Sequence, residues 1–298
     1  MEKTHKFTAD ESGSRLDMFI PGRLPELSRT YIQKLIADGY ITVNERAVKA
    51  SYKISDGDCI AVIIPPPAPS TLEAEDIPLT IVYEDEDLLV IDKPAGLTVH
   101  PAPGSPSHTL VNALLSRFID LPTGDDLARP GIVHRLDKDT SGLMLVAKNR
   151  VALNKLANQF KARSVIKAYL VLVRGHLSPE SGFIDAPIGR DPRHRKRMAV
   201  VNEGRQARTE YQVIKYTGDC TLLEARLETG RTHQIRVHLS AIGYPVVGDT
   251  TYGVKSPLLS RQFVHACRLG FRLPSSGQYV EFESELPPDL EQALAKIA

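Results

Sequence analysis

Residues 129–148 read RPGIVHRLDKDTSGLMLVAK, in which a polar loop lies between two apolar runs. The run after the loop, 143–146, has the length and the composition of a buried strand. Strand-like runs also occupy 79–83, 88–91, 168–173, 209–216 and 221–227, and apolar periodicity predicts helices over 151–162 and 232–242. Because the strands outnumber the helices and do not alternate with them, the pattern predicts a mixed α+β sheet domain and not a series of βαβ units.

The polar loop has two interpretations. If residues 134–137 are extended, side-chain alternation places Arg135 and Asp137 on one side and His134 and Leu136 on the other. A carboxylate and a guanidinium would then share a face, as a catalytic site requires. The commoner explanation of such a string is a turn in which aspartate side chains accept backbone N–H bonds.

Two further segments carry candidate functional side chains. Residues 228–239 read ETGRTHQIRVHL, and the helix predicted there places His233 and Arg236, three residues apart, on one face. Residues 167–173 read KAYLVLV, which sets Tyr169 in an apolar strand. Taken singly, a helical arginine is more often a surface residue, and a buried tyrosine more often only packs and satisfies its own hydroxyl.

A proline-rich segment, PPPAPS at 65–70, divides the chain unequally. Fixed φ angles and missing N–H donors prevent it from continuing a helix or a central strand, so it predicts a semi-rigid linker. We expect a small α+β domain, a linker and a large catalytic domain. Their expected bounds are 1–64 (core 14–64), 65–75 and 76–298.

The small domain shows one helix clearly. Ser28 can cap it, and Ile32, Leu35 and Ile36 lie on its apolar face. Alternating residues at 41–44 then predict a strand. This helix followed by a hairpin resembles the S4-like RNA-binding module, although a capped amphipathic helix with a polar outer face would explain the helix alone.

The charge of the chain is balanced overall but uneven along the sequence. The 298 residues include 37 Lys and Arg and 36 Asp and Glu, a formal net charge of +1. Residues 54–92 hold ten acidic residues and no Lys or Arg, whereas 161–215 hold twelve basic residues and five acidic ones. Such a division is typical of a nucleic-acid footprint on one face, and the counts alone fit solvated surface equally well.

The sequence argues against several classes of site. Cys59, Cys220 and Cys267 lie far apart, which disfavours a zinc knuckle, an iron–sulfur site and a disulfide framework and fits a reducing cytosol. There is no His-Glu-x-x-His, Gly-x-Ser-x-Gly, Walker or Gly-x-Gly-x-x-Gly pattern. No apolar run approaches the roughly 20 residues of a membrane span. We therefore expect a cytoplasmic protein with no metal, no cofactor and no membrane partner.

Together these segments resemble the RluA/RluD family of pseudouridine synthases over almost the whole chain. The catalytic motif of that family corresponds to HRLD at 134–137 with TSG at 140–142. Its strand tyrosine corresponds to Tyr169 and its arginine motif to GRTHQIRVH at 230–238. One departure is RLP at 272–274, where members often have a His-Pro pair.

The resemblance implies a mainly antiparallel pseudouridine synthase fold and an isomerisation of uridine in RNA. Asp137 would either attack C1′ or abstract a ribose proton, and the sequence leaves both courses open. Arg236 would pair with Asp137. Tyr169 would stack on the uracil and could relay the C5 proton, but a phenol with a pKa near 10 is a poor base, so positioning is its expected role.

The RNA contacts expected from this resemblance form two groups, with Arg135 placed to occupy the space that a flipped base vacates. The pocket group comprises Arg135, His134, Thr140 and Lys93, and the backbone group comprises Arg193, Arg195, Lys196, Arg29 and Lys34. The S4-like module and the length favour large-subunit ribosomal RNA, and transfer RNA is the alternative substrate. Two other classes compete: a non-catalytic RNA-binding or ribosome-assembly factor, and a hydrolase that would release free uracil. We expect a monomer.

Overall fold

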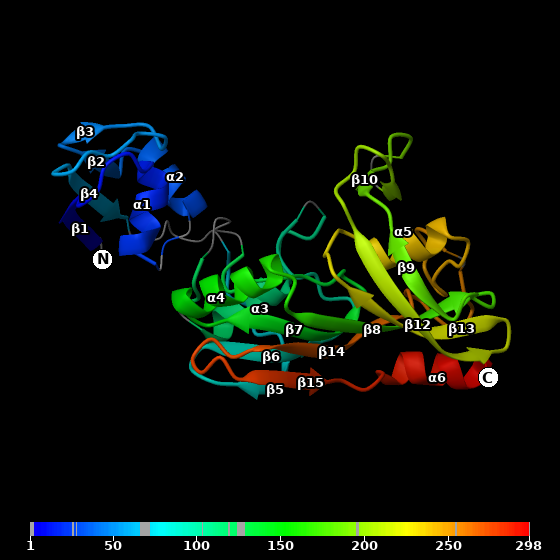
Figure 1. Ribbon diagram of the computed structural model, residues 1–298. Helices are drawn as coiled ribbons and strands as arrows, with labels where there is room; N and C mark the ends of the chain where they lie inside the picture. The colour runs from blue at the N-terminus through cyan, green and yellow to red at the C-terminus, as the bar shows by residue number, and fades with distance from the viewer. Residues whose placement is uncertain are drawn as a thin grey trace.

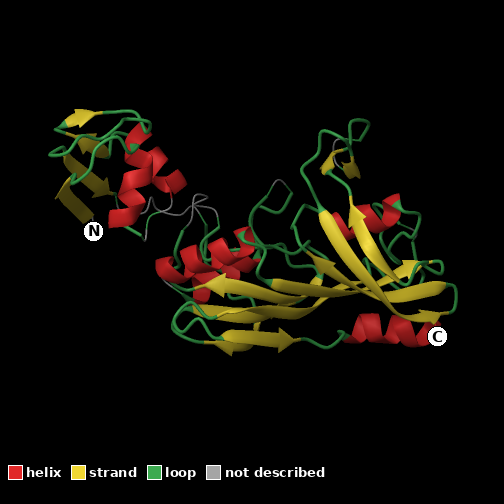
Figure 2. Cartoon of the chain, viewed as in Figure 1, coloured by secondary structure: helices red, strands yellow, loops and turns green. Residues whose placement is uncertain are grey.

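The computed structural model describes residues 3–25, 27, 29–65, 72–102, 104–118, 120–123, 129–194, 197–253 and 255–297. Figure 1 shows a small N-terminal domain, in blue, beside a larger domain built on one long sheet. Strands make up most of the regular structure of the large domain (Figure 2). Within the described ranges, no helix is both long and apolar enough to cross a membrane.

The N-terminal domain combines two helices with a four-stranded sheet of order β1-β4-β2-β3. Its elements are β1 (Lys3–Thr8), α1 (Leu16–Arg23), α2 (Arg29–Ala37), β2 (Ile41–Val43), β3 (Arg46–Ala47) and β4 (Cys59–Ile64). The predicted helix is confirmed as α2, with Ile32, Leu35 and Ile36 buried, while its expected cap, Ser28, lies outside the described residues. The sequence did not predict α1, which contains Pro21, because proline is rare inside helices.

The end of the expected linker is attached to the large domain. Residues 66–71 lie outside the described ranges. After them, Asn112 Nδ2 donates to the Glu73 carbonyl at 2.7 Å, and the Glu75 N–H donates to the Asn112 carbonyl at 3.0 Å. Residues 73–75 therefore run along α3 (Leu110–Arg117).

The large domain is organised around a nine-stranded sheet. Its strands are β5 (Thr80–Glu84), β6 (Leu88–Lys93), β7 (Ser141–Ala147), β8 (Ile166–Arg174), β9 (Ser181–Asp185), β12 (Arg208–Thr217), β13 (Cys220–Leu227), β14 (Val264–Arg272) and β15 (Tyr279–Glu283). The order is β5-β6-β7-β14-β8-β13-β12-β9, with β15 also paired to β14. Neighbouring strands are antiparallel except β7 and β14, which are parallel. The predicted α+β class and each of the six predicted strands in this domain are confirmed.

Helices cover both faces of the sheet near β6. Alternate side chains of that strand point to opposite faces, so Leu89 and Ile91 join the core formed with α3. Leu88 and Val90 join a separate core formed with α4 (Arg150–Lys161). The other helices are α5 (Gln234–Ala241) and α6 (Pro288–Ile297), and β10 (Ile188–Arg190) and β11 (Met198–Val200) form a hairpin that projects from the sheet (Figure 1).

The two helices predicted in this domain are confirmed as α4 and α5, whereas α3 and α6 were not predicted. Each of the missed helices is short, with 8 and 10 residues. The start of α3 is fixed by a capping box between Thr109 and Asn112, a local signal that a search for long apolar periodicity does not detect.

The loop that carries Asp137 forms no regular strand at 134–137, and it bends into a turn just after Asp137. Its backbone turns because the Thr140 N–H donates to the Asp137 carbonyl at 3.1 Å. The loop is also held at its start, where the Ala147 N–H donates to the Gly131 carbonyl at 2.8 Å. A turn therefore lies at 137–140, directly after the segment for which an extended conformation was considered.

A close strand approach fixes the other end of the loop. Gly142 has a φ of 113°, and a Cβ there would lie 2.3 Å from the Ala266 carbonyl oxygen. Only glycine permits both the backbone angle and the approach. The parallel contact of β7 with β14 therefore begins directly after the loop.

Candidate active site

The three residues expected to carry the chemistry converge on one cavity. Asp137 comes from the loop before β7, Tyr169 from β8 and Arg236 from α5. All three line a cavity of about 480 Å³. The cavity is also lined by His134, Arg135, Thr140 and His233. The structure therefore brings together residues that the sequence separates by as many as 99 positions.

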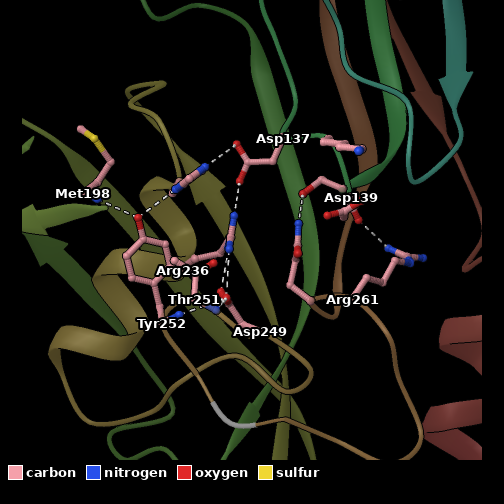
Figure 3. A network of polar contacts seen from close by, with 12 residues as sticks. Asp137, Asp139, Met198, Arg236, Asp249, Thr251, Tyr252 and Arg261 are labelled. Atoms are coloured by element: carbon pink, nitrogen blue, oxygen red, sulfur yellow. Dashed lines mark hydrogen bonds and ion pairs between the residues drawn. The ribbon is translucent and has the colours of Figure 1, made fainter. Parts of the chain in front are cut away.

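Arg236 connects two carboxylates at the base of this cavity (Figure 3). Its Nη1 donates to Asp137 Oδ2 at 3.0 Å, and its Nε and Nη2 donate to Asp249 Oδ2 and Oδ1 at 2.7 and 2.9 Å. Burial opposes the charge of Arg236, but the hydrogen bonds to both carboxylates raise its pKa above the usual range. Asp249 thus holds the guanidinium while one N–H remains for Asp137, an arrangement that charge-assisted bidentate bonds make rigid.

Asp249 is a site residue that the sequence did not reveal. It is 0% exposed, and its Oδ1 also accepts the N–H groups of Thr251 and Tyr252 at 2.8 and 3.1 Å. Burial alone would raise the pKa of Asp249, yet hydrogen bonds from Arg236 and these backbone groups lower it. In sequence the residue belongs to GDTTYG at 248–253, a string that reads as an ordinary turn.

His233 approaches Asp137 from the start of α5. Its Nε2 lies 4.0 Å from Asp137 Oδ1, and its Nδ1 lies 2.8 Å from the Tyr252 hydroxyl. Burial lowers the pKa of His233, although Asp137 opposes that shift, so the imidazole is neutral at pH 7. His233 precedes α5 and does not share a helical face with Arg236 as the sequence predicted, yet both side chains approach Asp137.

Tyr169 forms an apolar wall of the cavity beside Asp137. Its side chain belongs to the main core and is 6% exposed. Burial, reinforced by the Asp137 carboxylate, raises the pKa of Tyr169 far above its usual range. The phenol therefore stays protonated at neutral pH.

Two buried cations hold the backbone of the Asp137 loop. The Lys93 ammonium is 0% exposed and donates to the carbonyls of Pro94, Leu97 and Lys138 at 2.7, 2.9 and 3.0 Å. Arg261 Nη1 donates to the Asp139 carbonyl at 3.0 Å. Burial lowers the pKa of Lys93 to about 7. Consecutive carbonyls just after Asp137 are thus bound by cations from two different parts of the chain.

Arg261 is itself anchored by the C-terminal helix. Its Nε and Nη2 donate to Asp289 at 2.6 and 3.0 Å. Asp289 is in the first turn of α6. The sequence signalled neither residue, because an Arg in an irregular segment and an Asp at a helix start are common on protein surfaces.

The other predicted pocket residues have different surroundings. Arg135 is exposed and lines the cavity. His134 Nε2 accepts the Leu145 N–H at 2.9 Å, and its ring stacks on Phe160. Thr140 is buried. Arg135 is therefore the predicted pocket contact best placed to meet a ligand from solvent.

The predicted backbone-contact residues lie on two separate parts of the molecule. Arg193 and Lys34 are exposed, the former in the β10–β11 connection, where Arg195 and Lys196 fall outside the described residues. Arg29 donates to Asp17 Oδ2 from Nε and Nη2 at 3.1 and 2.9 Å. Arg29 is thus bonded to a residue of α1, whereas the sequence predicted it on a polar outer face of its own helix.

Comparison with known proteins places these features in a family. Residues 87–241 match the family described as RNA pseudouridylate synthase, and residues 14–60 match the S4 domain. The chain belongs to the RNA pseudouridylate synthase family. It is therefore an RNA pseudouridine synthase, an isomerase, and the resemblance seen in its sequence motifs is confirmed.

Relatives in this family and solved structures of other members are similar to this synthase over most of its length. An uncharacterized RNA pseudouridine synthase of Chloroflexus aurantiacus is 53% identical over 289 residues, covering 96% of this chain and 91% of the relative. Ribosomal large subunit pseudouridine synthase D of Zymomonas mobilis is 44% identical over 298 residues, covering 95% and 94%. The structure of human RNA pseudouridylate synthase domain containing 1 superposes with a TM-score of 0.60 at 32% identity, covering 74% of this chain and 89% of that one.

Proposed function

We propose that this synthase isomerises uridine in large-subunit ribosomal RNA and that Asp137 is its essential carboxylate. The observation that carries the assignment of Asp137 is its contact with the buried Arg236 inside the cavity. The ribosomal substrate is supported by relatives named ribosomal large subunit pseudouridine synthase D in Zymomonas mobilis and Nitrosomonas europaea, which are 44% and 45% identical to this chain.

The reaction conserves every atom of the base. The N1–C1′ bond breaks, the uracil rotates, C5 bonds to C1′, and the C5 proton is lost while N1 gains one. Asp137 either attacks C1′ or removes a ribose proton, and both courses require an ionised carboxylate with one accessible oxygen. Arg236 binds Oδ2, so Oδ1 is the oxygen that we assign to the chemistry.

The remaining cavity residues position the base and the loop. Tyr169 offers an apolar ring for stacking and, because its phenol stays protonated, serves as a platform and not as the resting-state base. Arg135, which lines the cavity, fills the space that the flipped uridine leaves. We assign Lys93 a positioning role, since its ammonium is enclosed by three carbonyls.

RNA binding uses the hairpin and the small domain. We propose domain bounds of 1–64 for the S4-like domain, 65–75 for the linker and 76–298 for the catalytic domain. The basic segment between β10 and β11, with Arg193, Arg195 and Lys196 in its sequence, contacts RNA phosphates, and Lys34 with Arg29 contributes from α2. Such contacts supply affinity and position without reading sequence.

The substrate can be tested by mapping pseudouridine in ribosomal and transfer RNA from cells with and without the gene. Loss of a site in large-subunit RNA, restored by adding the purified protein, is the expected result. Loss confined to transfer RNA would contradict the ribosomal assignment. We also propose a monomer in the cytoplasm, for which a single mass near 32.9 kDa in light scattering is expected.

A separate nucleoside analysis distinguishes the competing classes. Purified protein and target RNA should yield pseudouridine in the RNA and no free base. A hydrolase would release uracil, and a non-catalytic assembly factor would leave the uridine unchanged. Deleting residues 1–70 should weaken RNA binding more than it slows turnover on saturating RNA, because none of the described residues of the S4-like domain lines the cavity.

A further inference from the structure

The hydrogen-bond partners of His233 fix which of its ring nitrogens carries the proton. Tyr252 accepts the Met198 N–H at 2.8 Å and lies 2.8 Å from His233 Nδ1. Burial raises the pKa of Tyr252, so the phenol keeps its hydrogen. We place that hydrogen toward Nδ1, because Met198 is a donor to the hydroxyl and Nδ1 is the one acceptor in contact with it among the described residues.

The position of Asp137 also favours the His233 tautomer in which Nδ1 carries no hydrogen. With Nδ1 accepting, the neutral imidazole carries its hydrogen on Nε2, which lies 4.0 Å from Asp137 Oδ1. The opposite tautomer would turn a nitrogen lone pair toward a carboxylate oxygen. Electrostatics and hydrogen bonding therefore agree on an Nε2–H that faces the oxygen assigned to the chemistry.

The backbone of His233 is also unusual. The residue precedes α5 with a φ of 57°, a left-handed conformation that is uncommon for residues other than glycine and that asparagine, aspartate and histidine adopt more often than the rest. The conformation sends the ring toward Asp137 and Tyr252 together.

We propose that His233 is a positioning residue for the isomerisation, which directs its Nε2–H at Asp137 Oδ1, and that Tyr252 sets this tautomer. The inference rests on the proposed role of Asp137. At 4.0 Å the two atoms form no hydrogen bond, so the Nε2–H acts on the carboxylate through a directed electrostatic interaction that leaves Oδ1 free to react. Arg236 meanwhile holds Oδ2.

The β10–β11 hairpin takes part through its backbone. Met198 belongs to β11 and its N–H anchors the Tyr252 hydroxyl (Figure 3). The Arg197 guanidinium lies over the Tyr252 ring at 5.2 Å from its centroid. The same hairpin carries the basic residues proposed to bind phosphates. The position of the hairpin therefore affects both the binding of RNA and the tautomer of His233.

Two substitutions at position 233 separate positioning from a merely structural role. Asparagine tolerates a left-handed backbone and can replace Nδ1 toward Tyr252, but it is too short to present a donor to Asp137. Glutamine is less suited to the backbone but its amide reaches about as far as Nε2. We expect His233→Gln to retain most of the single-turnover rate on saturating RNA and His233→Asn to lose about 10-fold to 100-fold, with RNA affinity unchanged in both.

The controls make failure of this inference distinguishable from failure of the proposed function. Tyr279→Phe, which removes a hydroxyl bonded to Glu281 on β15, should leave the rate unchanged. Asp137→Asn is measured in parallel: if it is active, the proposed function fails as well. If it is inactive while His233→Asn is as fast as His233→Gln, only the role of His233 is overturned.

A spectroscopic measurement decides the tautomer even if a variant does not fold. In ¹⁵N-histidine-labelled wild-type protein, the long-range ¹H–¹⁵N spectrum should show His233 protonated on Nε2 and bare on Nδ1. The Tyr252→Phe variant, which has no hydroxyl to donate, should lose this preference. A proton on Nδ1 of His233 in the wild-type protein would overturn the proposal.

Discussion

Replacing Asp249 with asparagine tests whether the buried carboxylate holds the arginine that binds Asp137. Asp249 is 0% exposed and accepts two charged hydrogen bonds from Arg236 at 2.7 and 2.9 Å. Removing one partner of a buried ion pair costs about 3–5 kcal/mol. Asparagine keeps an oxygen for the neighbouring backbone N–H groups, so we expect the lower end, about 3 kcal/mol.

Comparing Asp249→Asn with Asp289→Asn isolates burial of the ion pair as the cause of the expected loss of stability. Arg261 and Asp289 have a similar bidentate geometry, at 2.6 and 3.0 Å, but the Asp289 side chain is 51% exposed. Asp289→Asn should therefore cost roughly 1 kcal/mol or less. Differential scanning calorimetry should show the catalytic-domain Tm of Asp249→Asn lowered by roughly 6–12 °C, with at most a few degrees for Asp289→Asn. An equal decrease of Tm in the two variants would show that burial of Asp249 does not set the cost.

The same change should also slow the reaction. Asp249 contacts no substrate in this account, so its effect on the rate passes through the guanidinium that binds Asp137. We expect kcat to fall about 10-fold to 100-fold, as with other supporting groups around a catalytic side chain, with little change in KM. A normal kcat in folded Asp249→Asn would show that Arg236 is positioned without it.

Three further outcomes are expected. Burial lowers the pKa of His134 to about 3, whereas a histidine in the unfolded chain titrates near 6.5. As pH falls, the unfolded chain therefore gains a proton before the folded protein does. The free energy of unfolding should decrease between about pH 6 and 4. His134→Gln should remove up to about 1.4 kcal/mol per pH unit from that slope in urea unfolding, and an identical slope would contradict a neutral buried ring. Gly142→Ala should destabilise the protein by roughly 3 kcal/mol, since backbone strain and overlap of the new Cβ with Ala266 add. The control Gly277→Ala, at a φ of 73° but in open space, should cost about 1–2 kcal/mol. Comparable Tm values for the two variants would contradict the close approach of β7 and β14 at Gly142. Alanine at Arg193, Arg195 and Lys196 together should reduce the slope of log K against log salt by about 1 for each phosphate that these side chains neutralise, and an unchanged slope would remove these residues from the RNA footprint.

Regular elements with strong periodicity were predictable from the sequence. Six strands of the large sheet and the helices α2, α4 and α5 were predicted from their apolar patterns, whereas β9, β14 and β15 of that sheet were not. The short α3 and the proline-containing α1 depend on a capping box and on tertiary packing, which overrides weak local preference.

The site was predictable where side chains belong to dense motifs. Asp137, Tyr169 and Arg236 lie together as expected, but their spacing in sequence says nothing of Asp249, which reaches Arg236 from a turn. The chain forms no regular strand at 134–137, and a backbone hydrogen bond from Thr140 to Asp137 makes a turn directly after it. Long-range partners of a charged group are set by the fold and leave no local pattern.

The most direct test of the central claim is the conversion of uridine to pseudouridine by Asp137→Asn. Purified wild-type protein and variant are incubated with the same large-subunit ribosomal RNA, and pseudouridine is quantified by nucleoside mass spectrometry. RNA affinity and Tm are measured in parallel to establish that the variant binds and folds. We predict no pseudouridine from the variant at wild-type binding; formation of pseudouridine at a wild-type rate would contradict the role of Asp137.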